Sequence, residues 1–292
     1  MPEFRSISDA LNRIEEGDWS AIREALASRP GAWRVALAGP PGVGKSTIID
    51  SVGSYLVRGG HSVAVLAIDP SSPRSGGALL GDRIRMRRLE REGQFIRSMT
   101  SPGSRPRLWI LAYAAIKLLA SSGFDYVFVE SIGGGQLDFE LAYFSDTFVY
   151  VTVPGLGDEI QVMKAGAAEL ADIIVVNKRD VAYTGALAEL YRRYVQERNG
   201  WLPRVLEFTS FCPSDVEALT EAIGEHRRHV EEHPKAAEDR RLTAIELLAL
   251  GVAGQGLDRW KYTALEGDTK GLSDLELLDD ALSSIGIKRP WE

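Results

Sequence analysis

Apolar residues change their spacing at about residue 30, and the change separates two kinds of predicted element. Between Ile7 and Ser28 they recur at helical spacing, which predicts an amphipathic helical lead-in. Beyond it, short unbroken apolar runs alternate with stretches of helical spacing. A run such as Ile173–Val176 is typical of a strand that is covered on both faces. This alternation predicts an α/β fold in which a mostly parallel central sheet is flanked by helices.

The apolar runs place the individual elements. The predicted strands are Trp33–Ala38, Val63–Ile68, Gln94–Ser98, Tyr126–Glu130, Thr147–Val153, Ile173–Val176 and Arg204–Thr209. The predicted helices between them lie near Lys45–Arg58, Asp82–Glu92, Leu108–Ser121, Ile160–Leu170 and Ala186–Arg198. Because ligands of such sheets bind beyond the carboxyl ends of the strands, segments that directly follow a strand are where we look for chemistry.

From about residue 225 the pattern becomes helical again. A break at Glu231–Pro234 separates two predicted helices, the second near Ala236–Trp260, and Leu272–Ile287 is a further helical segment. We therefore divide the chain into an N-terminal helical extension (1–30), a sheet-containing domain (31–226) and a C-terminal helical arm (227–292). The arm is a candidate for homodimerisation or partner contact, and a helix simply docked on the sheet is equally compatible with the pattern.

Composition and charge narrow the class of protein. The 292 residues are 45% hydrophobic and 26% charged, as in ordinary soluble domains, and the formal net charge of −7 argues against a nucleic-acid partner. The N-terminus has no signal-peptide pattern. The most apolar helical stretch, Leu108–Ala120, is too short to span a bilayer and contains Lys117. We expect a cytoplasmic protein without a membrane partner.

The first chemical motif directly follows the first predicted strand. Residues 39–46 match G-x-x-x-x-G-K-[ST], the phosphate-binding loop of P-loop NTPases. Its glycines allow a tight turn whose N–H groups face phosphate oxygens, and the following helix adds its dipole. Lys45 is expected to reach the β- and γ-phosphates, and Ser46 to ligate Mg²⁺. The predicted nucleotide-binding residues here are Gly39, Pro40, Pro41, Gly42, Val43, Gly44, Lys45, Ser46 and Thr47.

A second motif follows the strand at Ile173–Val176. Asn177-Lys178-Arg179-Asp180 matches N-K-x-D, which selects guanine because the Asp180 carboxylate can accept from N1–H and the 2-amino group. Adenine offers neither donor, so the carboxylate would stay unpaired. Asn177 is expected to contact the base edge or to brace the phosphate loop, and the Lys178 stem can cover the purine face. The nucleotide is therefore expected to be GTP, or GDP after hydrolysis.

A third motif follows the strand at Tyr126–Glu130. A carboxylate at a strand end before the Gly-rich segment 132–136 suits a switch that senses the γ-phosphate. We expect Glu130 to hold Mg²⁺ directly or through water, and Gly133 to offer its N–H to the γ-phosphate. Gln136 lies three residues beyond Gly133, so it does not repeat the water-positioning Gln of small GTPases. Slow intrinsic hydrolysis that a partner stimulates is the expected consequence.

Further motifs, taken in order, resemble the MeaB/ArgK-type GTPases. They are Asp69–Pro73, Ser75–Gly77, Leu80–Arg83, Phe95–Ser98, Glu130–Gln136 and Pro154–Gln161. The resemblance is dense between residues 33 and 181 and thinner elsewhere. It implies a GTPase that serves as a G-protein chaperone of adenosylcobalamin-dependent acyl-CoA mutases, such as methylmalonyl-CoA mutase. Cofactor loading and protection or reactivation of the mutase would then depend on GTP. The resemblance also implies a homodimer formed through helical C-terminal segments.

The resemblance assigns roles to residues of this chain. Asp69 and Asp82 would be first-switch carboxylates near Mg²⁺, and Glu130 the second-switch ligand; with Lys45 they are the expected catalytic residues. Ser210 lies where the family has its base-binding turn. A third switch, which would report nucleotide state to the mutase, would contain Asp158, Gln161 and Lys164.

Two other functions remain open at this point. A small-molecule kinase of the amino-acid transport type would need an acceptor pocket and a base, for which Asp69 or Asp82 could serve. A nickel-delivery GTPase of similar fold usually stores metal on clusters of Cys and His. Here Cys212 is the single cysteine, and His226, His229 and His233 alone would make a poor closed metal site.

Overall fold

The computed structural model describes residues 4–69, 86–100, 105–131, 137–156, 168–253 and 273–284. Its strands are β1 (Trp33–Ala38), β2 (Val63–Asp69), β3 (Phe95–Thr100), β4 (Tyr126–Ser131), β5 (Thr147–Thr152), β6 (Ile173–Asn177) and β7 (Arg204–Phe208). Its helices are α1 (Phe4–Glu16), α2 (Trp19–Ala27), α3 (Lys45–Arg58), α5 (Arg87–Arg91), α6 (Arg105–Ala120), α7 (Leu137–Phe144), η1 (Ala168–Leu170), α9 (Gly185–Tyr194), α10 (Pro213–Glu232), α11 (Pro234–Ala253) and α13 (Asp274–Ser284).

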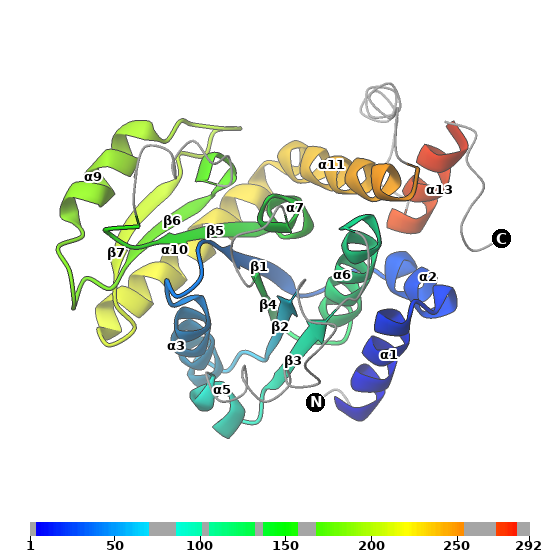
Figure 1. The fold of residues 1–292 in the computed structure, drawn as a ribbon, viewed down its shortest axis with the longest axis horizontal. Coiled ribbons are helices and arrows are strands. Elements are labelled where there is room, and N and C mark those ends of the chain that lie inside the picture. The colour runs from blue at the N-terminus through cyan, green and yellow to red at the C-terminus, as the bar shows by residue number, and fades with distance from the viewer. Residues whose placement is uncertain are drawn as a thin grey trace.

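The strands form one seven-stranded sheet in the order β3-β2-β4-β1-β5-β6-β7. Every neighbouring pair is parallel, which confirms the predicted fold class. Parallel neighbours need crossover connections, and the helices between the strands supply them. In Figure 1 the strands run through the middle of the molecule, with α3 and α10 on one side and α6 on the other. β1, which leads into the phosphate loop, lies at the centre of the sheet.

Two apolar clusters fill the spaces on either side of the sheet. One joins the sheet to α3, α5 and α10, with Ile48, Val52, Leu89 and Leu219 among its fully buried side chains. The other joins the opposite face to α6, α7 and α9 and continues into α1, α2, α11 and α13. Central strands are therefore covered on both faces, which explains their unbroken apolar sequences.

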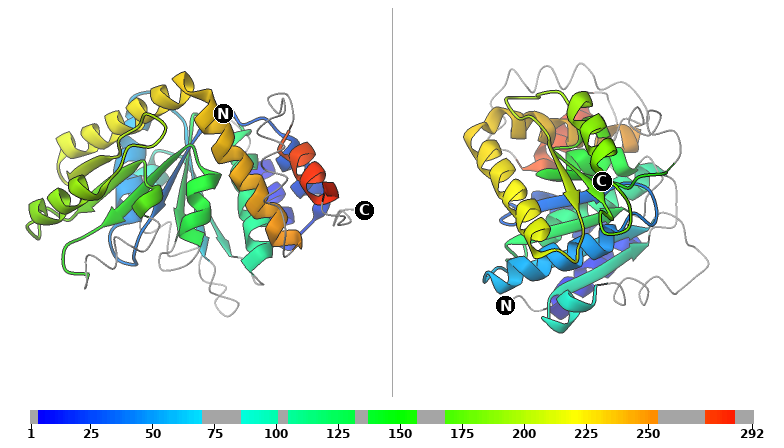
Figure 2. Two further views of the ribbon diagram at one scale, coloured as in Figure 1. Left: turned by 90° about the horizontal axis from the view of Figure 1, so that it is seen from above. Right: turned by 90° about the vertical axis from the view of Figure 1, so that its left-hand side faces the viewer.

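The helices from the two ends of the described chain gather around α6. α1, α2 and α11 pack against α6, and α13 packs against both α2 and α11, as Figure 2 shows on the right of its left-hand view. Asp274 at the start of α13 is buried, where it accepts from Tyr113 Oη at 2.8 Å and pairs with Lys117 Nζ at 2.8 Å. This ion pair fixes α13 against α6. α10 continues unbroken through residue 226, where the sequence predicted a domain boundary. The helix has no break at this position, and the boundary stays a prediction.

Several element ends differ from the predicted ones. The lead-in consists of two helices, because Gly17 (φ 83°) turns the chain and Asp18 then caps α2 by accepting from Ser20 N at 2.8 Å. The helix predicted over Ala186–Arg198 ends at Tyr194. The predicted helix Ile160–Leu170 is described only from residue 168, as a short 3₁₀ turn, and the predicted Asp82–Glu92 only from residue 86.

α9 ends where Val195 adopts an extended backbone (φ −60°, ψ 141°), and a tight turn follows it. Asn199 (φ 51°) and Gly200 (φ 78°) form a tight turn, and the backbones of Arg198 and Trp201 on either side exchange hydrogen bonds of 2.9 Å. Two left-handed residues in succession are characteristic of the type I′ hairpin turn, for which Asn-Gly is the preferred pair. The Asn-Gly dipeptide is a sequence signal for this turn that the helical periodicity obscured.

Candidate functional site

The phosphate loop connects the end of β1 to the start of α3, at the carboxyl edge of the sheet. Gly39 (φ 138°) crosses so close to β5 that a Cβ there would lie 2.0 Å from the carbonyl oxygen of Val151. A Cβ on Gly44 (φ 98°) would lie 2.6 Å from Asn177 Nδ2. Both positions therefore exclude any side chain, on conformational and steric grounds. The glycines let the loop fold over the strand ends.

Lys45 lies against the inside of this loop. Its side chain is buried, and Nζ donates to the carbonyl oxygens of Gly39 at 2.7 Å and Pro40 at 3.1 Å. These contacts hold a cation beside the loop backbone at the N-terminal end of α3, where the helix dipole also favours an anion. Lys45 and the N-terminus of α3 thus place positive charge beside the loop, which is what a polyphosphate needs.

Ser46 and Glu130 form the second part of the site. β4 pairs with β1 so that Glu130 lies opposite Leu37, which brings the end of β4 beside the loop. Ser46 Oγ donates to Glu130 Oε1 at 2.7 Å, and both residues are buried. A hydroxyl and a carboxylate oxygen are ligands that Mg²⁺ prefers, so this pair fits the predicted metal. The backbone of Asp69 ends β2, the other neighbour of β4, at the same edge of the sheet.

The third part comes from β6, two strands from β1. Asn177 Nδ2 donates to the carbonyl oxygen of Val43 at 2.7 Å, so Asn177 contacts the phosphate loop, one of the two positions expected for it. Lys178 adopts a left-handed backbone (φ 66°), and its Nζ donates to the carbonyl oxygen of Gly42 at 2.8 Å. These two side chains connect the N-K-x-D segment to the phosphate loop.

Asp180 lies on the exposed part of the same segment. It lines a cavity with Tyr183, Thr184, Glu207 and Thr209. Thr184 Oγ1 donates to Glu207 Oε2 at 2.6 Å, which joins the segment after β6 to β7. The cavity therefore lies between the loops that follow β6 and β7, at the same edge of the sheet as the phosphate loop, where a base would extend from a nucleotide bound by that loop.

Residues that the sequence interpretation missed support this cavity. Arg179 pairs with Asp215 at 2.6 Å, and Asp215 Oδ2 also accepts from Thr209 N at 2.9 Å. Asp215 belongs to the first turn of α10, where a carboxylate favours the helix terminus. Its place after the helix-starting Pro213 is the signal that could have found it. Ser210 is buried in the turn that Asp215 anchors.

The only cysteine of the chain also lies at this turn. Cys212 Sγ lies 3.1 Å from Ser214 Oγ and accepts from Arg179 Nη2 at 3.2 Å. The hydrogen bonds with Ser214 and Arg179 lower the pKa of the Cys212 thiol. Arg179 thus contacts both Cys212 and Asp215 and links the N-K-x-D segment to the loop after β7.

Other predicted site residues lie outside the described parts of the chain. These are Asp82, Gly133, Asp158, Gln161 and Lys164. For Asp69 the structure describes the backbone alone. Across the ranges that it does describe, no three His, Cys, Asp or Glu side chains come together as a metal site, and no helix has the length and apolarity to cross a membrane.

Comparisons with known proteins agree with this geometry. Residues 14–261 match the protein family described as methylmalonyl Co-A mutase-associated GTPase MeaB. A Pyrococcus horikoshii protein named as a GTPase is 40% identical over 260 residues, which is 86% of this chain and 82% of the relative. The GTPase ArgK of Escherichia coli is 36% identical over 74% of this chain and 67% of its own length. The mouse mitochondrial methylmalonic aciduria type A homolog is 35% identical over 69% of this chain and 51% of its own length.

Solved structures confirm the fold. A crystal structure of a LAO/AO transport system kinase superposes with a TM-score of 0.57 at 22% identity and covers 98% of this chain and 99% of that one. HypB from Helicobacter pylori in complex with nickel gives a TM-score of 0.50 at 16% identity, over 78% of this chain and 97% of that one. At these identities the two structures establish the P-loop NTPase fold alone.

Proposed function

This chain belongs to the family of methylmalonyl-CoA mutase-associated GTPases, and we propose that it couples GTP binding and hydrolysis to the service of an adenosylcobalamin-dependent acyl-CoA mutase. In this role it gates the loading of the cofactor onto the mutase and protects or reactivates the enzyme. The proposal includes a homodimer and a cytoplasmic location. The family name and the mouse relative support a partner of the methylmalonyl-CoA mutase class.

The contact between Ser46 and Glu130 is the observation on which the switching role rests. Ser46 belongs to the phosphate loop, and Glu130 is the penultimate residue of β4, just before the predicted γ-phosphate switch at 132–136. A change at the phosphates that moves Ser46 therefore also acts on the end of β4. Because the Glu130 side chain is buried, it cannot exchange Ser46 for bulk water without cost. This coupling would carry the nucleotide state toward a partner surface.

Each residue of the site has a proposed task at the nucleotide. Lys45 and the loop N–H groups bind the β- and γ-phosphates, and Asp180 selects guanine. Ser46, Glu130, Asp69 and Asp82 would hold Mg²⁺, which would offset the charge that develops on the phosphate oxygens. Asn177 and Lys178 keep the phosphate loop and the base-binding segment in register through their contacts with Val43 and Gly42.

A binding measurement with nucleotide varied tests the proposal. The full chain is titrated with methylmalonyl-CoA mutase in the presence of GDP or of a non-hydrolysable GTP analogue. We expect at least a roughly fivefold difference in the Kd for the mutase, about 1 kcal/mol. Glu130→Gln should reduce this difference below twofold, since a neutral amide weakens the contact with Ser46. Glu189→Gln, on the exposed face of α9, is the matched control and should retain the difference.

Two results would count against the proposal. If the mutase binds with neither nucleotide, it is not a partner of this chain. If it binds equally well with both, the nucleotide does not signal to it.

A further inference from the structure

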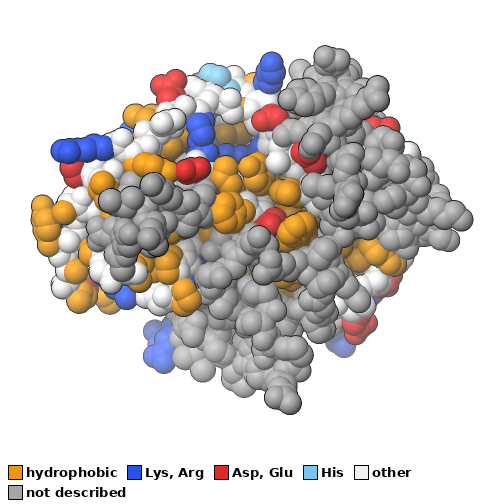
Figure 3. Space-filling view, turned by 45° about the horizontal axis from the view of Figure 1, so that its top comes forward, with side chains coloured by type: hydrophobic (Ala, Val, Ile, Leu, Met, Phe, Trp, Pro, Cys, Tyr) orange, Lys and Arg blue, Asp and Glu red, His pale blue; other side chains and the backbone are white. Residues whose placement is uncertain are grey.

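A second cavity lies at the opposite edge of the sheet from the nucleotide site. It has a volume of about 200 Å³ and is bordered by Arg34 at the start of β1, and by Asp146 and Asp172, which directly precede β5 and β6. Residues of α7, α10, α11 and the turn at 198–201 complete it. Strands of this length separate it from the phosphate loop by about 15–20 Å. Figure 3 shows Lys or Arg side chains beside hydrophobic ones in a hollow of the upper surface.

Most charges around the cavity are already paired. Arg34 forms a bidentate pair with Asp146, and Arg240 does the same with Asp172 at 2.8 and 2.9 Å. Although burial alone would raise the pKa of the Asp172 carboxyl, Arg240 and the neighbouring His226 hold it well below its ordinary value. Asp172 also accepts from Phe148 N at 2.8 Å. The two ion pairs neutralise the charges of these four side chains and hold them in fixed positions.

Arg198 differs from Arg34 and Arg240 in its contacts. Its Nη2 donates to the carbonyl oxygen of Ala171 at 2.6 Å, and within the described residues no carboxylate lies at ion-pair distance from it. A guanidinium has five N–H donors, so a backbone oxygen satisfies a small part of its capacity. Arg198 is half-buried, and the cost of partly removing this cation from water lowers its pKa. An anion placed against it would offset that cost through charge-assisted, bidentate hydrogen bonds.

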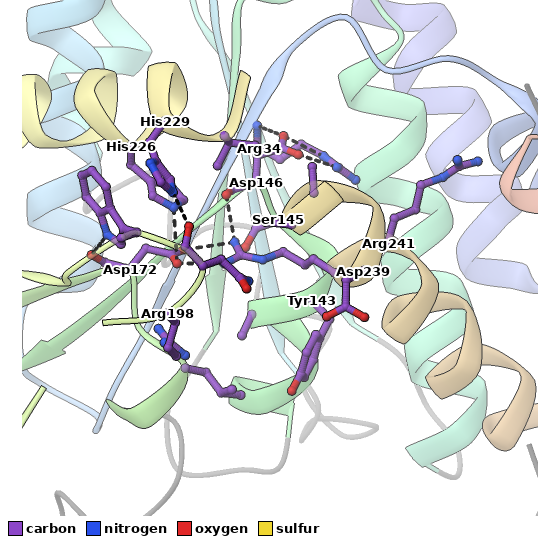
Figure 4. Close-up of a pocket in the computed structure, with 18 of the residues that line it drawn as sticks. Arg34, Tyr143, Ser145, Asp146, Asp172, Arg198, His226, His229, Asp239 and Arg241 are labelled. Atoms are coloured by element: carbon purple, nitrogen blue, oxygen red, sulfur yellow. Dashed lines mark hydrogen bonds and ion pairs between the residues drawn. The ribbon is translucent and has the colours of Figure 1, made fainter. Parts of the chain in front are cut away.

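The backbone holds Arg198 in place. It precedes the Asn199-Gly200 turn and pairs with Trp201, whose Nε1 donates to the carbonyl oxygen of Asp172 at 2.9 Å. In Figure 4, Arg198 and Tyr143 lie on opposite sides of the hollow, below Asp172. A guanidinium held by a tight turn and by a backbone contact loses little freedom when it binds a ligand, which favours affinity.

The lining also limits the charge and the size of the ligand. Of its four arginines, Arg34 and Arg240 are paired with Asp146 and Asp172, and Arg241 is paired outside the lining with Asp274. Arg198 is therefore the lining arginine that can accept one anionic group. A monoanion matches this single cation better than a dianion. The side chains of Leu170, Tyr143 and Trp201 supply apolar surface. A cavity of about 150 Å³ holds benzene, so this one accommodates a ring-sized apolar body and one charged group.

We propose that this cavity binds a small organic monocarboxylate, with its carboxylate on Arg198 and its apolar body against Tyr143, Leu170 and Trp201. The site is independent of the nucleotide and of the proposed mutase role. It would give the protein a second small-molecule ligand at the amino edge of the sheet.

The test compares two ligands of equal shape and different charge. Benzoate and benzamide are titrated into the full chain, and Kd values are measured by ligand-detected NMR. We expect benzoate to bind at least tenfold more tightly than benzamide, and Arg198→Gln to bring the two Kd values within about twofold. Arg193→Gln, on the exposed face of α9, should leave the tenfold preference unchanged.

Further variants keep the proposal falsifiable if Arg198→Gln does not fold. Ala236→Leu fills the cavity from the first turn of α11 and keeps Arg198, so it should weaken both ligands at least fivefold. Equal affinities for benzoate and benzamide, a preference that survives Arg198→Gln, or Ala236→Leu without effect would each overturn the proposal. Displacement of benzoate by an equal concentration of inorganic phosphate would overturn its assignment to carboxylates.

Discussion

The two edges of the sheet both collect charged side chains, but they satisfy them in different ways. At the carboxyl edge, Lys45 and Lys178 donate to backbone carbonyl oxygens of the phosphate loop. At the amino edge, Arg34 and Arg240 are paired with the carboxylates of Asp146 and Asp172. A carbonyl oxygen is a weaker partner for a cation than a carboxylate, so an incoming anion competes more readily with the first kind of contact, such as that of Lys178 with Gly42, than with the ion pairs of Arg34 and Arg240.

The two kinds of contact predominate at different edges, but the division is not complete. Arg179 at the carboxyl edge pairs with Asp215, and Arg240 at the amino edge also donates to the carbonyl oxygen of Asp146 at 2.8 Å. Arg198 lies at the amino edge, yet its contact with the Ala171 carbonyl is of the first kind. That is why we assign the cavity beside it a ligand. Variants at the two edges should therefore separate folding from binding.

The largest expected effect is on stability, from Asp172→Ala. This change leaves Arg240 without its buried partner and removes the acceptor of Phe148 N. Breaking a buried pair in this way should lower the free energy of unfolding by about 3–5 kcal/mol. Urea unfolding of the variant and the wild type measures this difference in the free energy of unfolding. Glu189→Ala removes an exposed pair with Arg193 and should change stability by less than about 0.5 kcal/mol. A loss below about 1 kcal/mol for Asp172→Ala would refute the structural assignment of the amino edge.

A smaller effect, on binding alone, is expected from Asp180→Asn. The exposed carboxylate contributes little to folding, so the unfolding free energy should stay within about 0.5 kcal/mol of wild type. The preference for GTP over ATP should fall by roughly tenfold to a hundredfold, because the amide presents a donor to the donors of guanine. Calorimetry with both nucleotides measures the preference. An unchanged preference would show that another residue selects the base, and equal affinities in the wild type would remove guanine selection itself.

The smallest expected effect is a loss of stability at low pH. The pKa of Asp172 is held below its unfolded value of 3.8 by Arg240 and His226 despite burial, and the pKa of Asp274 is lowered by Lys117 and Arg241 against the same penalty. A lowered carboxyl pKa contributes stability above the unfolded pKa, and this stability is lost as pH falls below it. Between pH 5 and pH 3 we expect the free energy of unfolding to fall as both carboxylates approach their unfolded pKa, by about 1 kcal/mol for Asp172. Urea midpoints across this range measure the loss, and Asp172→Asn should reduce the slope. Urea midpoints that stay constant between pH 5 and pH 3 would contradict the ion pairing of Asp172 and Asp274.

The phosphate loop shows what local sequence can predict. The motif at residues 39–46 can be recognised because all its parts lie close together in the sequence. They are glycines that permit left-handed turns, a lysine, and a hydroxyl at the start of a helix. The strands were predictable for a similar reason, since burial on both faces leaves a continuous apolar run. The end of α9 was placed four residues too late, because the helix stops where Val195 becomes extended, and no residue type at that position signals the stop.

The sequence by itself determined that this chain has a parallel α/β sheet and a phosphate-loop motif, and it predicted a guanine-selecting segment, because each of these depends on short-range pattern and residue type. The tertiary structure alone decided which distant residues meet. Ser46 contacts Glu130, 84 positions away, and Asn177 contacts Val43, 134 positions away. These contacts follow from the strand order β3-β2-β4-β1-β5-β6-β7. Alternating strands and helices are compatible with several orders, and packing of the whole sheet selects one of them.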